Sequence, residues 1–397
     1  MMKEAGIELM KNTKSVKDID VSGKRVLIRV DFNVPMDEDF DISDDTRIRE
    51  ALPTINYCID NHAKNIVLVS HLGRPKGRSA EFSLKHVIKR VERLLGRDVG
   101  FAESIEEAAL LQEQSPSGSV ILLENIRFCV GEEKNDKDLS QKLAALCDIY
   151  VNDAFGTSHR AHSSTCGIAE FAKERVAGLL LKKEIDSFAK AMANPLKPVL
   201  LIVGGSKVSS KLALLYNILD VVDKIIIGGA MSNTFLKACG YDMQKSLVEE
   251  DLVAEAKKIL EHAREKKVKI YLPVDVVSTD DVKSHTQIKI TPAQDVPEGF
   301  MAVDMGPATS KLFSEVVRDS QTIIWNGPLG IYEIQAFSRG TFNLAHAVSD
   351  TYAFSLIGGG DRAGERDNMS FISTGGGASL ELLEGKILPA FKVLERK

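Results

Sequence analysis

The sequence predicts an α/β fold of two domains, each an open parallel sheet flanked by helices, with a helix joining them. At 397 residues the chain is longer than one hydrophobic core usually organises. Short β-branched apolar runs alternate with helical patterns in both halves, as expected of βαβ units. A charged amphipathic segment separates the halves. We therefore expect two Rossmann-like domains joined by a hinge helix.

Eight short apolar runs are the expected buried strands of the two sheets. They are residues 25–30, 66–70, 120–123 and 149–152 in the first half, and 198–203, 224–227, 322–325 and 354–357 in the second. Helical periodicity separates them, for example over residues 84–96.

The expected connection between the domains is LKKEIDSFAKAMANPLKP, residues 181–198. This segment is typical of a charged amphipathic helix that ends at Asn-Pro and a second proline. We expect the first domain to cover residues 1–181, the hinge helix residues 182–197 and the second domain residues 198–383.

Composition and charge exclude several classes of protein. The chain is 44% hydrophobic and 27% charged with a net charge of -5, whereas a protein that binds nucleic acid or an anionic membrane normally carries a basic excess. Its five cysteines form no CxxC pair, which favours reduced thiols. No apolar run approaches ~18 residues. We expect a cytoplasmic protein without a nucleic-acid or membrane partner.

A glycine run near the C-terminus, Ser373 to Gly385, is the most informative motif. Gly375, Gly376 and Gly377 open a short amphipathic helix, with two hydroxyl residues in front of them. The first amides of a helix lack intrahelical acceptors, and glycine lets a phosphate approach the backbone closely. The run predicts a phosphate-binding helix start; taken alone, it is equally compatible with a turn that caps an ordinary helix.

The loops after the first-half strands are rich in arginine and histidine. Of the 18 arginines, 12 lie in the first 181 residues, and three of four strand-end loops contain one. Ligands of open parallel sheets bind beyond the carboxyl ends of the strands. Arginine can grip phosphate or carboxylate with two hydrogen bonds. A single arginine more often forms a surface ion pair, but the shared placement of the set predicts an anion pocket.

The loops after the second-half strands are rich in glycine. Residues 204–211, GGSKVSSK, follow a strand, and we expect them to open a helix with Lys207 and Lys211 on one face, beside helix-terminal amides. This arrangement suits a polyphosphate, although no Walker A motif occurs. Asp361 follows a run of three glycines and is the expected Mg²⁺ partner. A solvated turn is the alternative for this aspartate.

A dehydrogenase is the main alternative, because residues 358–363 match the loose dinucleotide pattern G-x-G-x-x-A after a strand. Only seven residues separate Ala363 from the next apolar pair, Phe371-Ile372. A full crossover helix does not fit in that length, which argues against this alternative.

Together, the motifs resemble the phosphoglycerate kinase family over nearly the whole chain. The motifs that carry the resemblance, in the family's order, are RVDFNVP, SHLGRP, ENIRF, NDAFGTSHRAHSS, GGSKVSSK, WNGPLGIYE, GGGD and STGGGASLELLEGK. The resemblance implies that the first domain binds 3-phosphoglycerate or 1,3-bisphosphoglycerate and the second binds Mg²⁺ with ATP or ADP. It also implies that a tail of about residues 384–397 packs back on the first domain, and we expect a monomer.

The resemblance also implies roles for individual residues. The residues expected to bind the acid substrate are Arg29, Asp31, Phe32, Asn33, Arg47, His71, Leu72, Gly73, Arg74, Arg127 and Arg160. Those expected to bind nucleotide are Gly205, Lys207, Lys211, Gly229, Asn326, Gly327, Glu333, Gly359, Gly360, Asp361 and Arg362, with Glu333 near the ribose and Asp361 on Mg²⁺. The expected catalytic set is Arg47, Lys207, Gly375, Gly376 and Gly377.

The chemistry of the implied reaction agrees with these residue types. A carboxylate nucleophile is ionised at pH 7, so phosphoryl transfer to it needs no general base. It needs alignment and positive charge around the moving group, with the two domains closing to expel water. Arg362, Ser210 and the string GGAMSNTF depart from the family's usual residues, which affects nucleotide preference more than reaction type. A catalytically silent ligand sensor is the third hypothesis.

Overall fold

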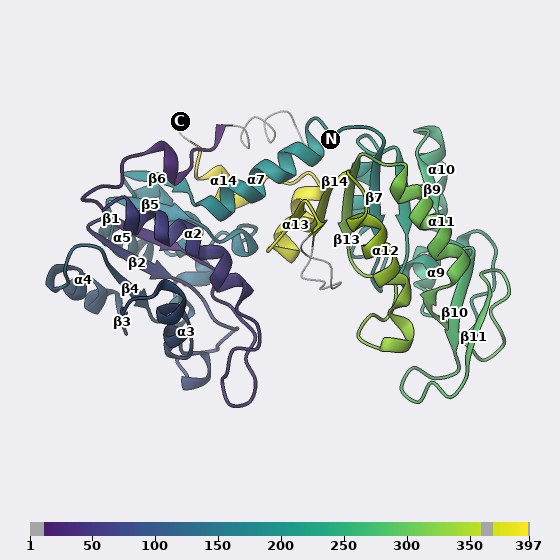
Figure 1. Cartoon of the computed structure of the whole chain (residues 1–397), viewed down its shortest axis with the longest axis horizontal. Helices are drawn as coiled ribbons and strands as arrows, with labels where there is room; N and C mark the ends of the chain where they lie inside the picture. Colours follow the sequence, from purple (N-terminus) through teal and green to yellow (C-terminus); the bar gives the residue numbers. More distant parts are fainter. Residues whose placement is uncertain (1–11, 359–367, 396–397) are drawn as a thin grey trace. The chain divides into compact units, whose positions relative to one another are not determined.

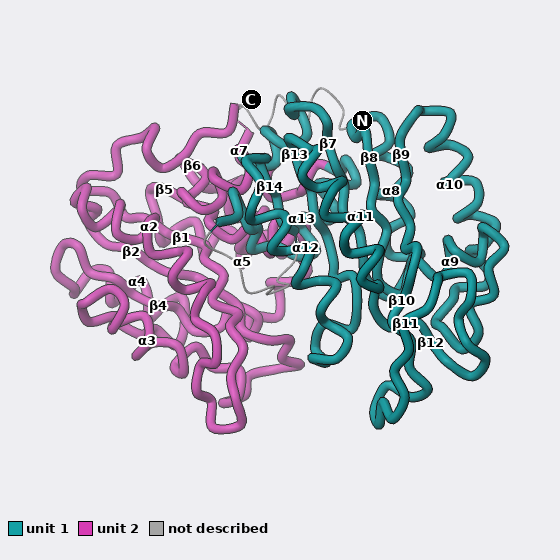
Figure 2. Tube along the Cα trace, turned by 45° about the vertical axis from the view of Figure 1, so that its right-hand side comes forward, with its two compact units in different colours: residues 1–3, 187–386 teal, residues 4–186, 387–397 magenta. Residues whose placement is uncertain are grey.

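The computed structural model describes residues 12–358 and 368–395, which form two compact units. Unit 1 contains Ser187–Lys386, and unit 2 contains the described residues up to Asp186 together with those from Ile387 onward (Figure 2). Each unit is built around its own six-stranded sheet. Within the described residues no helix is long and apolar enough to span a membrane.

The sheet of unit 2 is parallel throughout and has the order β3-β4-β2-β1-β5-β6. Its strands are β1 Arg25–Arg29, β2 Asn65–Val69, β3 Val99–Ala102, β4 Ser119–Leu123, β5 Ile149–Asn152 and β6 Glu174–Ala177 (Figure 1). All residues of β2 and β5 are buried, as expected of central strands covered on both faces.

The helices of unit 2 begin and end at recognisable signals. Asp136 caps α5 by accepting the amide of Leu139, and Gly96 ends α3 in the left-handed region at φ 66°. The helices are α2 Thr46–Asp60, α3 Lys85–Leu95, α4 Ile105–Gln114, α5 Lys137–Ala145, α6 Ile168–Phe171 and α14 Pro389–Lys392. Helix α7, Leu179–Met192, crosses the division between the units.

Unit 1 contains a second parallel sheet, of order β15-β14-β13-β7-β8-β9, and a separate antiparallel sheet, of order β11-β10-β12. The parallel strands are β7 Val199–Val203, β8 Lys224–Ile227, β9 Lys269–Tyr271, β13 Thr322–Asn326, β14 Phe354–Gly358 and β15 Phe371–Ile372. The antiparallel strands are β10 Asp275–Thr279, β11 Ile288–Pro292 and β12 Met301–Met305. The helices are α8 Leu212–Ile218, α9 Met231–Ala238, α10 Val253–Glu265, α11 Pro307–Arg318, α12 Arg339–Ser349 and α13 Gly376–Leu383.

The structure confirms the predicted fold class, and all eight predicted strands are present within one residue of their expected bounds. The prediction missed β3, β6, β9 and β15, as well as the antiparallel sheet. These strands lie at sheet edges or in the smaller sheet, where the apolar signal is weak. Strand β3 reads VGFA with one exposed residue, and β11 is mostly exposed.

Strand order places a topological switch point in each parallel sheet. In unit 2, β1 lies between β2 and β5. Strands β3 and β4 lie on the β2 side of β1, and β6 lies on the β5 side. In unit 1, β7 lies between β13 and β8 in the same way. Successive crossovers that run in opposite directions place helices on both faces and open a crevice beyond the strand ends. The functional site is therefore expected beyond the carboxyl ends of β1 and β7.

The C-terminal residues form part of the core of unit 2. Phe391 of α14 is 1% exposed, and its ring stacks on that of Phe155 at 6.0 Å between centroids. The amide of Ala390 donates to the carbonyl of Ser158 at 3.2 Å. This packing joins the end of the chain to the segment that follows β5.

A buried carboxyl group supports the loop after β13 in unit 1. Asp304 of β12 is 5% exposed and accepts the amides of Met305 and Gly340, each at 2.9 Å. A Cβ at Gly330 or Gly340 would collide with this carboxylate, so the backbone packs closely around it. Burial raises the pKa of Asp304 to about 7, although the amide of Gly340 and then that of Met305 oppose the shift.

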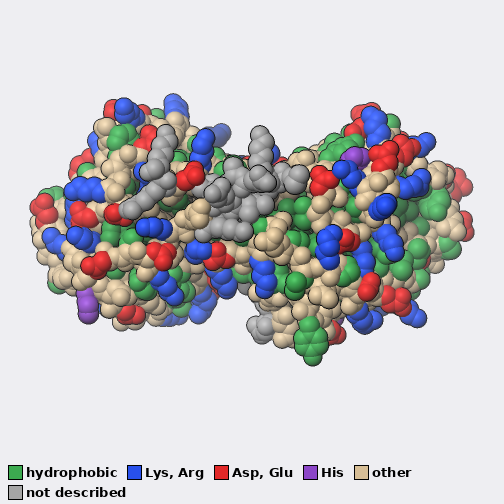
Figure 3. All heavy atoms as spheres, turned by 90° about the horizontal axis from the view of Figure 1, so that it is seen from above, with side chains coloured by type: hydrophobic (Ala, Val, Ile, Leu, Met, Phe, Trp, Pro, Cys, Tyr) green, Lys and Arg blue, Asp and Glu red, His purple; other side chains and the backbone are tan. Residues whose placement is uncertain are grey.

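Charges of both signs are interspersed on the face of the molecule shown in Figure 3. This mixing is typical of a solvated surface.

We expect Phe391→Ala to lower the free energy of unfolding by about 3 to 4 kcal/mol, because it removes a buried ring and leaves a cavity. Urea unfolding followed by far-UV circular dichroism measures the change. Tyr352→Ala, at a fully exposed aromatic residue, is the control and should change the free energy by less than about 0.5 kcal/mol. Equal effects of the two variants would contradict a structural role for the C-terminal segment.

We expect Asp304 to make stability fall between about pH 4 and pH 7. Because its pKa is raised in the folded state, the folded chain binds more protons than the unfolded chain in this window, and unfolding becomes easier as pH rises. The contribution reaches at most about 4 kcal/mol. Asp304→Asn should flatten this slope in urea unfolding, whereas Asp350→Asn, at an exposed residue, should keep it. Identical slopes in all three proteins would refute the prediction.

Candidate functional site

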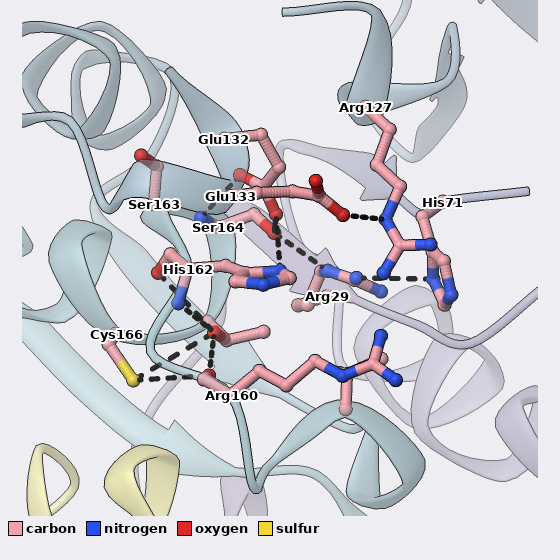
Figure 4. A network of polar contacts seen from close by, with 12 residues as sticks. Arg29, His71, Arg127, Glu132, Glu133, Arg160, His162, Ser163, Ser164 and Cys166 are labelled. Carbon is pink, nitrogen blue, oxygen red and sulfur yellow. Dashed lines mark hydrogen bonds and ion pairs between the residues drawn. The ribbon is translucent and has the colours of Figure 1, made fainter. Parts of the chain in front are cut away.

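Five cationic or basic side chains gather in unit 2 beyond the carboxyl ends of its strands. This basic cluster consists of Arg29, Arg47, His71, Arg127 and Arg160. Figure 4 labels Arg29, His71, Arg127 and Arg160. Arg29 is the last residue of β1, and His71, Arg127 and Arg160 lie in the loops after β2, β4 and β5. Arg47 lies in the first turn of α2. The cluster therefore lies at the switch point of this sheet.

Asp31 and Asn33 connect Arg47 to the loop after β2. The Nη1 of Arg47 donates to Asp31 Oδ2 at 3.1 Å and to the carbonyl of Asn33 at 3.0 Å. The side chain of Asn33 accepts the amide of Gly73 at 2.7 Å. The side chain of Arg47 is 37% exposed. Its Nη1 is therefore bonded to the protein while the rest of the guanidinium can reach solvent.

Arg127, which follows β4, also bonds to the loop after β2. Its Nη1 donates to the carbonyl of Gly73, and its Nε lies 3.3 Å from Glu133 Oε1. Burial lowers the pKa of Arg127, and the positive charges of Arg160 and Arg29 add to this shift. An anion in the cluster would therefore relieve repulsion among the arginines.

Arg29 is almost fully buried, and each of its three nitrogens contacts a partner in the protein. Its Nε donates to Ser164 Oγ at 2.9 Å, its Nη1 donates to the carbonyl of Val30, and its Nη2 lies 3.4 Å from His71 Nδ1. Ser164 in turn donates to Glu132 Oε1 at 2.6 Å through its hydroxyl and to Oε2 at 3.0 Å through its amide. Glu132 is 1% exposed. Burial raises the pKa of Glu132, whereas the charge of Arg29 and the hydrogen bonds from Ser164 favour its ionised form.

Two histidines of this region, His71 and His162, have pKa values that disfavour the charged ring. Burial, followed by the charges of Arg29, Arg127, Arg47 and Arg160, lowers the pKa of His71 well below its ordinary value. Burial and neighbouring arginines also lower the pKa of His162 to about 4. Both rings are therefore neutral at pH 7.

The remaining residues predicted to bind the acid substrate lie outside this set of contacts. The side chains of Phe32 and Leu72 belong to the hydrophobic core and are not open to a ligand. Arg74 is exposed. Sequence reasoning missed the roles of Glu132 and Ser164: Glu132 lies outside the recognised motifs, and Ser164 is the last residue of the motif NDAFGTSHRAHSS.

Glycines gather in unit 1 beyond the ends of β7, β8 and β13. A Cβ at Gly204 would collide with the carbonyl of Pro328, and a Cβ at Gly229 would collide with the backbone of Gly205. Backbone hydrogen bonds join the three loops, including Gly229 N to Leu329 O at 3.0 Å. Only glycine permits this close approach. The cluster brings together the predicted nucleotide residues Gly205, Gly229, Gly327 and Asn326.

The start of α13 lies beside the ends of β13 and β14. A Cβ at Gly358 would lie 3.1 Å from Asn326 Nδ2 and 3.5 Å from Ser379 Cβ. Gly375 is the N-cap of α13 and, as a glycine, has no side chain that could cap the helix. Gly376 and Gly377 are exposed, and a Cβ at Gly376 would have no neighbour within 4 Å. The first amides of α13 can therefore receive an anion.

The predicted placement of the two lysines on one helical face is wrong. Helix α8 begins at Leu212, Lys211 is its N-cap, and Lys207 lies in the preceding turn. The run of serines after Lys207 favours this turn, in which Ser210 Oγ donates to the carbonyl of Lys207 at 2.8 Å. Lys207 and Glu333 are exposed, outside the glycine contacts. The predicted residues Gly359, Gly360, Asp361 and Arg362 lie outside the described residues.

The two clusters have different chemical capacities. The cluster in unit 2 offers side-chain charge and suits a small multiply charged anion. The cluster in unit 1 offers backbone amides and close approach, which suits a polyphosphate.

Comparisons with known proteins identify the family of the chain. The family model for phosphoglycerate kinase matches residues 16–386. The phosphoglycerate kinase of Helicobacter hepaticus is 88% identical over 402 aligned residues, covering 100% of both chains. That of Helicobacter pylori strain 26695 is 61% identical and covers 99% of both.

Solved structures of the same family share the fold. Phosphoglycerate kinase from Coxiella burnetii aligns with a TM-score of 0.88 at 43% identity, covering 96% of this chain and 98% of that one. The enzyme from Pyrococcus horikoshii OT3 aligns with a TM-score of 0.84 at 30% identity and the same coverage. The motifs, the two parallel sheets and these relatives lead to one conclusion: the chain belongs to the phosphoglycerate kinase family, whose members are phosphotransferases.

Proposed function

We propose that the protein transfers a phosphoryl group reversibly between the acyl phosphate of 1,3-bisphosphoglycerate and ADP, giving 3-phosphoglycerate and ATP. The basic cluster at the switch point of unit 2 is the observation that carries this proposal. Its arginines lie together at the carboxyl edge of the sheet. In two of them, Arg47 and Arg127, the protein binds only part of the guanidinium group. Such an arrangement suits a substrate with both a carboxylate and a phosphate.

The acid substrate would bind in unit 2 at Asp31, Asn33, Arg47, His71 and Arg127. Arg74 and Arg160, from neighbouring loops, would add positive charge. Its carboxylate is the nucleophile in the direction of ATP consumption and is ionised near neutral pH, so no side chain needs to remove a proton. The role of this unit is to orient the carboxylate and neutralise the substrate's phosphate.

The nucleotide would bind in unit 1, with its phosphates against the glycine cluster. Lys207 and Lys211 would supply positive charge to the phosphates, and Glu333 would contact the ribose. The first amides of α13 would stabilise the phosphoryl group during transfer, because charge develops on its oxygens at that point. The open space at Gly376 supports this role.

Mg²⁺ would be held by Asp361 together with nucleotide phosphates. Among the described residues no three His, Cys, Asp or Glu side chains form a group that could hold a metal. Mg²⁺ in nucleotide sites commonly takes one or two protein carboxylates and draws its other oxygens from phosphate and water. Asn326 Oδ1, at the end of β13, is buried without a hydrogen-bond partner among the described residues, so this strand end offers a further oxygen donor. Bound Mg²⁺ supplies positive charge to the phosphate oxygens.

Transfer would require closure of the two units, since acceptor and donor bind to different sheets. Closure would also exclude water, which otherwise competes as an acceptor. Five cysteines, all free thiols, support a reducing cytoplasmic location.

We expect the protein to convert ATP to ADP only when both 3-phosphoglycerate and Mg²⁺ are present. We further expect Lys207→Ala to lower kcat by about 10² to 10³-fold, the scale for removing one charge-stabilising donor. A coupled assay of ADP formation measures both. Lys257→Ala, at an exposed residue of α10, is the matched control and should keep full activity. Turnover that is independent of 3-phosphoglycerate would overturn the proposal.

We expect bulky substitution at Gly376 to reduce kcat more than it raises the KM of either substrate, because the amides of α13 act on the moving group. Gly376→Ala and Gly376→Leu form a graded series at a position with room for a side chain, so the fold should be retained. Steady-state kinetics at several ATP and 3-phosphoglycerate concentrations separate the two parameters. Raised KM values with an unchanged kcat would reduce α13 to a ground-state binding site.

A further inference from the structure

Arg29 differs from Arg47 in being shielded from solvent, and each of its three nitrogens has a partner within the protein. All three of its nitrogen positions meet partners within the protein, namely Ser164, the carbonyl of Val30, and His71. Its side chain is 1% exposed, whereas that of Arg47 is 37% exposed. A direct contact between Arg29 and the substrate does not fit this geometry.

The contact between Arg29 and His71 restricts the protonation of the imidazole. A guanidinium carries only donors, so the ring atom that faces Arg29 must accept. That atom is Nδ1, at 3.4 Å from Nη2 of Arg29. Asp31 is the competing partner, but its Oδ1 is 3.8 Å from Nδ1, and its Oδ2 already accepts from Arg47. A neutral ring with an accepting Nδ1 carries its proton on Nε2.

The buried pair Ser164 and Glu132 holds Arg29 from behind. The Ser164 hydroxyl accepts from Arg29 Nε and donates to Glu132, so it uses its donor and one acceptor position in a chain. Glu132 also lies 3.7 Å from Nδ1 of His162. Such a fully buried chain has few alternative arrangements, because breaking one bond leaves a polar group without water.

We propose that Arg29 is a positioning residue that, anchored by Ser164 and Glu132, fixes His71 as the Nε2–H tautomer, so that His71 presents a single hydrogen-bond donor to the acid substrate. The donor role rests on the proposed function; the tautomer does not. The charged groups around His71 come from four elements or loops: Arg29 and Asp31 from β1 and its end, Arg47 from α2, Arg127 after β4 and Arg160 after β5. Burial, followed by these four positive charges, lowers the pKa of His71 and keeps the ring neutral.

The test is the protonation state of His71 in the full chain. Long-range ¹H–¹⁵N correlation spectra of the eight histidines distinguish Nε2–H, Nδ1–H and the doubly protonated ring, and His71→Asn identifies the signal. We expect the Nε2–H form without ligand, with no protonation of His71 down to pH 6. A ring with its proton on Nδ1, or one that titrates above pH 6, would overturn the proposal.

Two neighbouring serines provide matched variants. Ser164→Ala removes the link between Arg29 and Glu132. Ser163→Ala removes an equally buried hydroxyl whose hydrogen-bond partners, within residues 12–358 and 368–395, are the carbonyls of Gly131 and Asp136 and not the chain of Arg29 and Glu132. We expect Ser164→Ala to mix the His71 tautomers and to raise the KM for 3-phosphoglycerate by roughly 3- to 30-fold, with kcat and the KM for ATP nearly unchanged. Ser163→Ala should change neither the spectrum nor KM.

The outcomes separate this inference from the proposed function. Equal changes in both serine variants would show general loosening of the turn and refute the positioning role. An active wild-type protein with Nδ1–H on His71 would refute the inference alone. A wild-type protein that shows Nε2–H on His71 and lacks turnover dependent on 3-phosphoglycerate would refute the proposed function and the donor role, while the tautomer assignment would stand.

Discussion

Parallel pairing of β1 with β2 and β5 is the constraint on which the rest of the site in unit 2 depends. In register, Arg29 pairs with Val69 and with Asn152, so the three strands end side by side. The loops that follow must therefore start at one edge of the sheet. No single loop contains the basic cluster. Its members are separated by up to 131 residues in sequence, from Arg29 to Arg160. They lie together because the strands that precede them end at the same edge of the sheet.

Bringing these positive charges together is electrostatically unfavourable, and buried polar partners offset part of the repulsion. Arg29 and Glu132 are both about 1% exposed, and each would be strongly unfavourable alone. Ser164 links the two through hydrogen bonds. The basic cluster therefore has a buried, fixed member in Arg29 and a more exposed member in Arg47. The histidines between these charges stay neutral. Repulsion among the arginines is left for an anionic substrate to relieve.

The two units reach anion binding by different physical means. Unit 2 uses side-chain charges, which require support from a second layer of buried groups. Unit 1 uses backbone amides at strand ends and at the start of α13, where glycine removes the steric barrier to close approach. Asp304 supports the backbone of unit 1 as Glu132 supports Arg29 in unit 2: in each case a buried carboxyl group, absent from every motif, holds the visible residues in place.

The sequence by itself determined the fold class, all eight central strands, the family and the motif residues, because buried parallel strands and glycine or arginine loops leave strong local patterns. It failed for the edge strands, for the position of Lys207 relative to α8, and for Glu132, Ser164 and Asp304. Only the tertiary structure decided that Arg29 faces the interior while Arg47 reaches solvent. The reason is that burial and hydrogen-bond pairing depend on residues distant in sequence, whereas periodicity and turn chemistry are local.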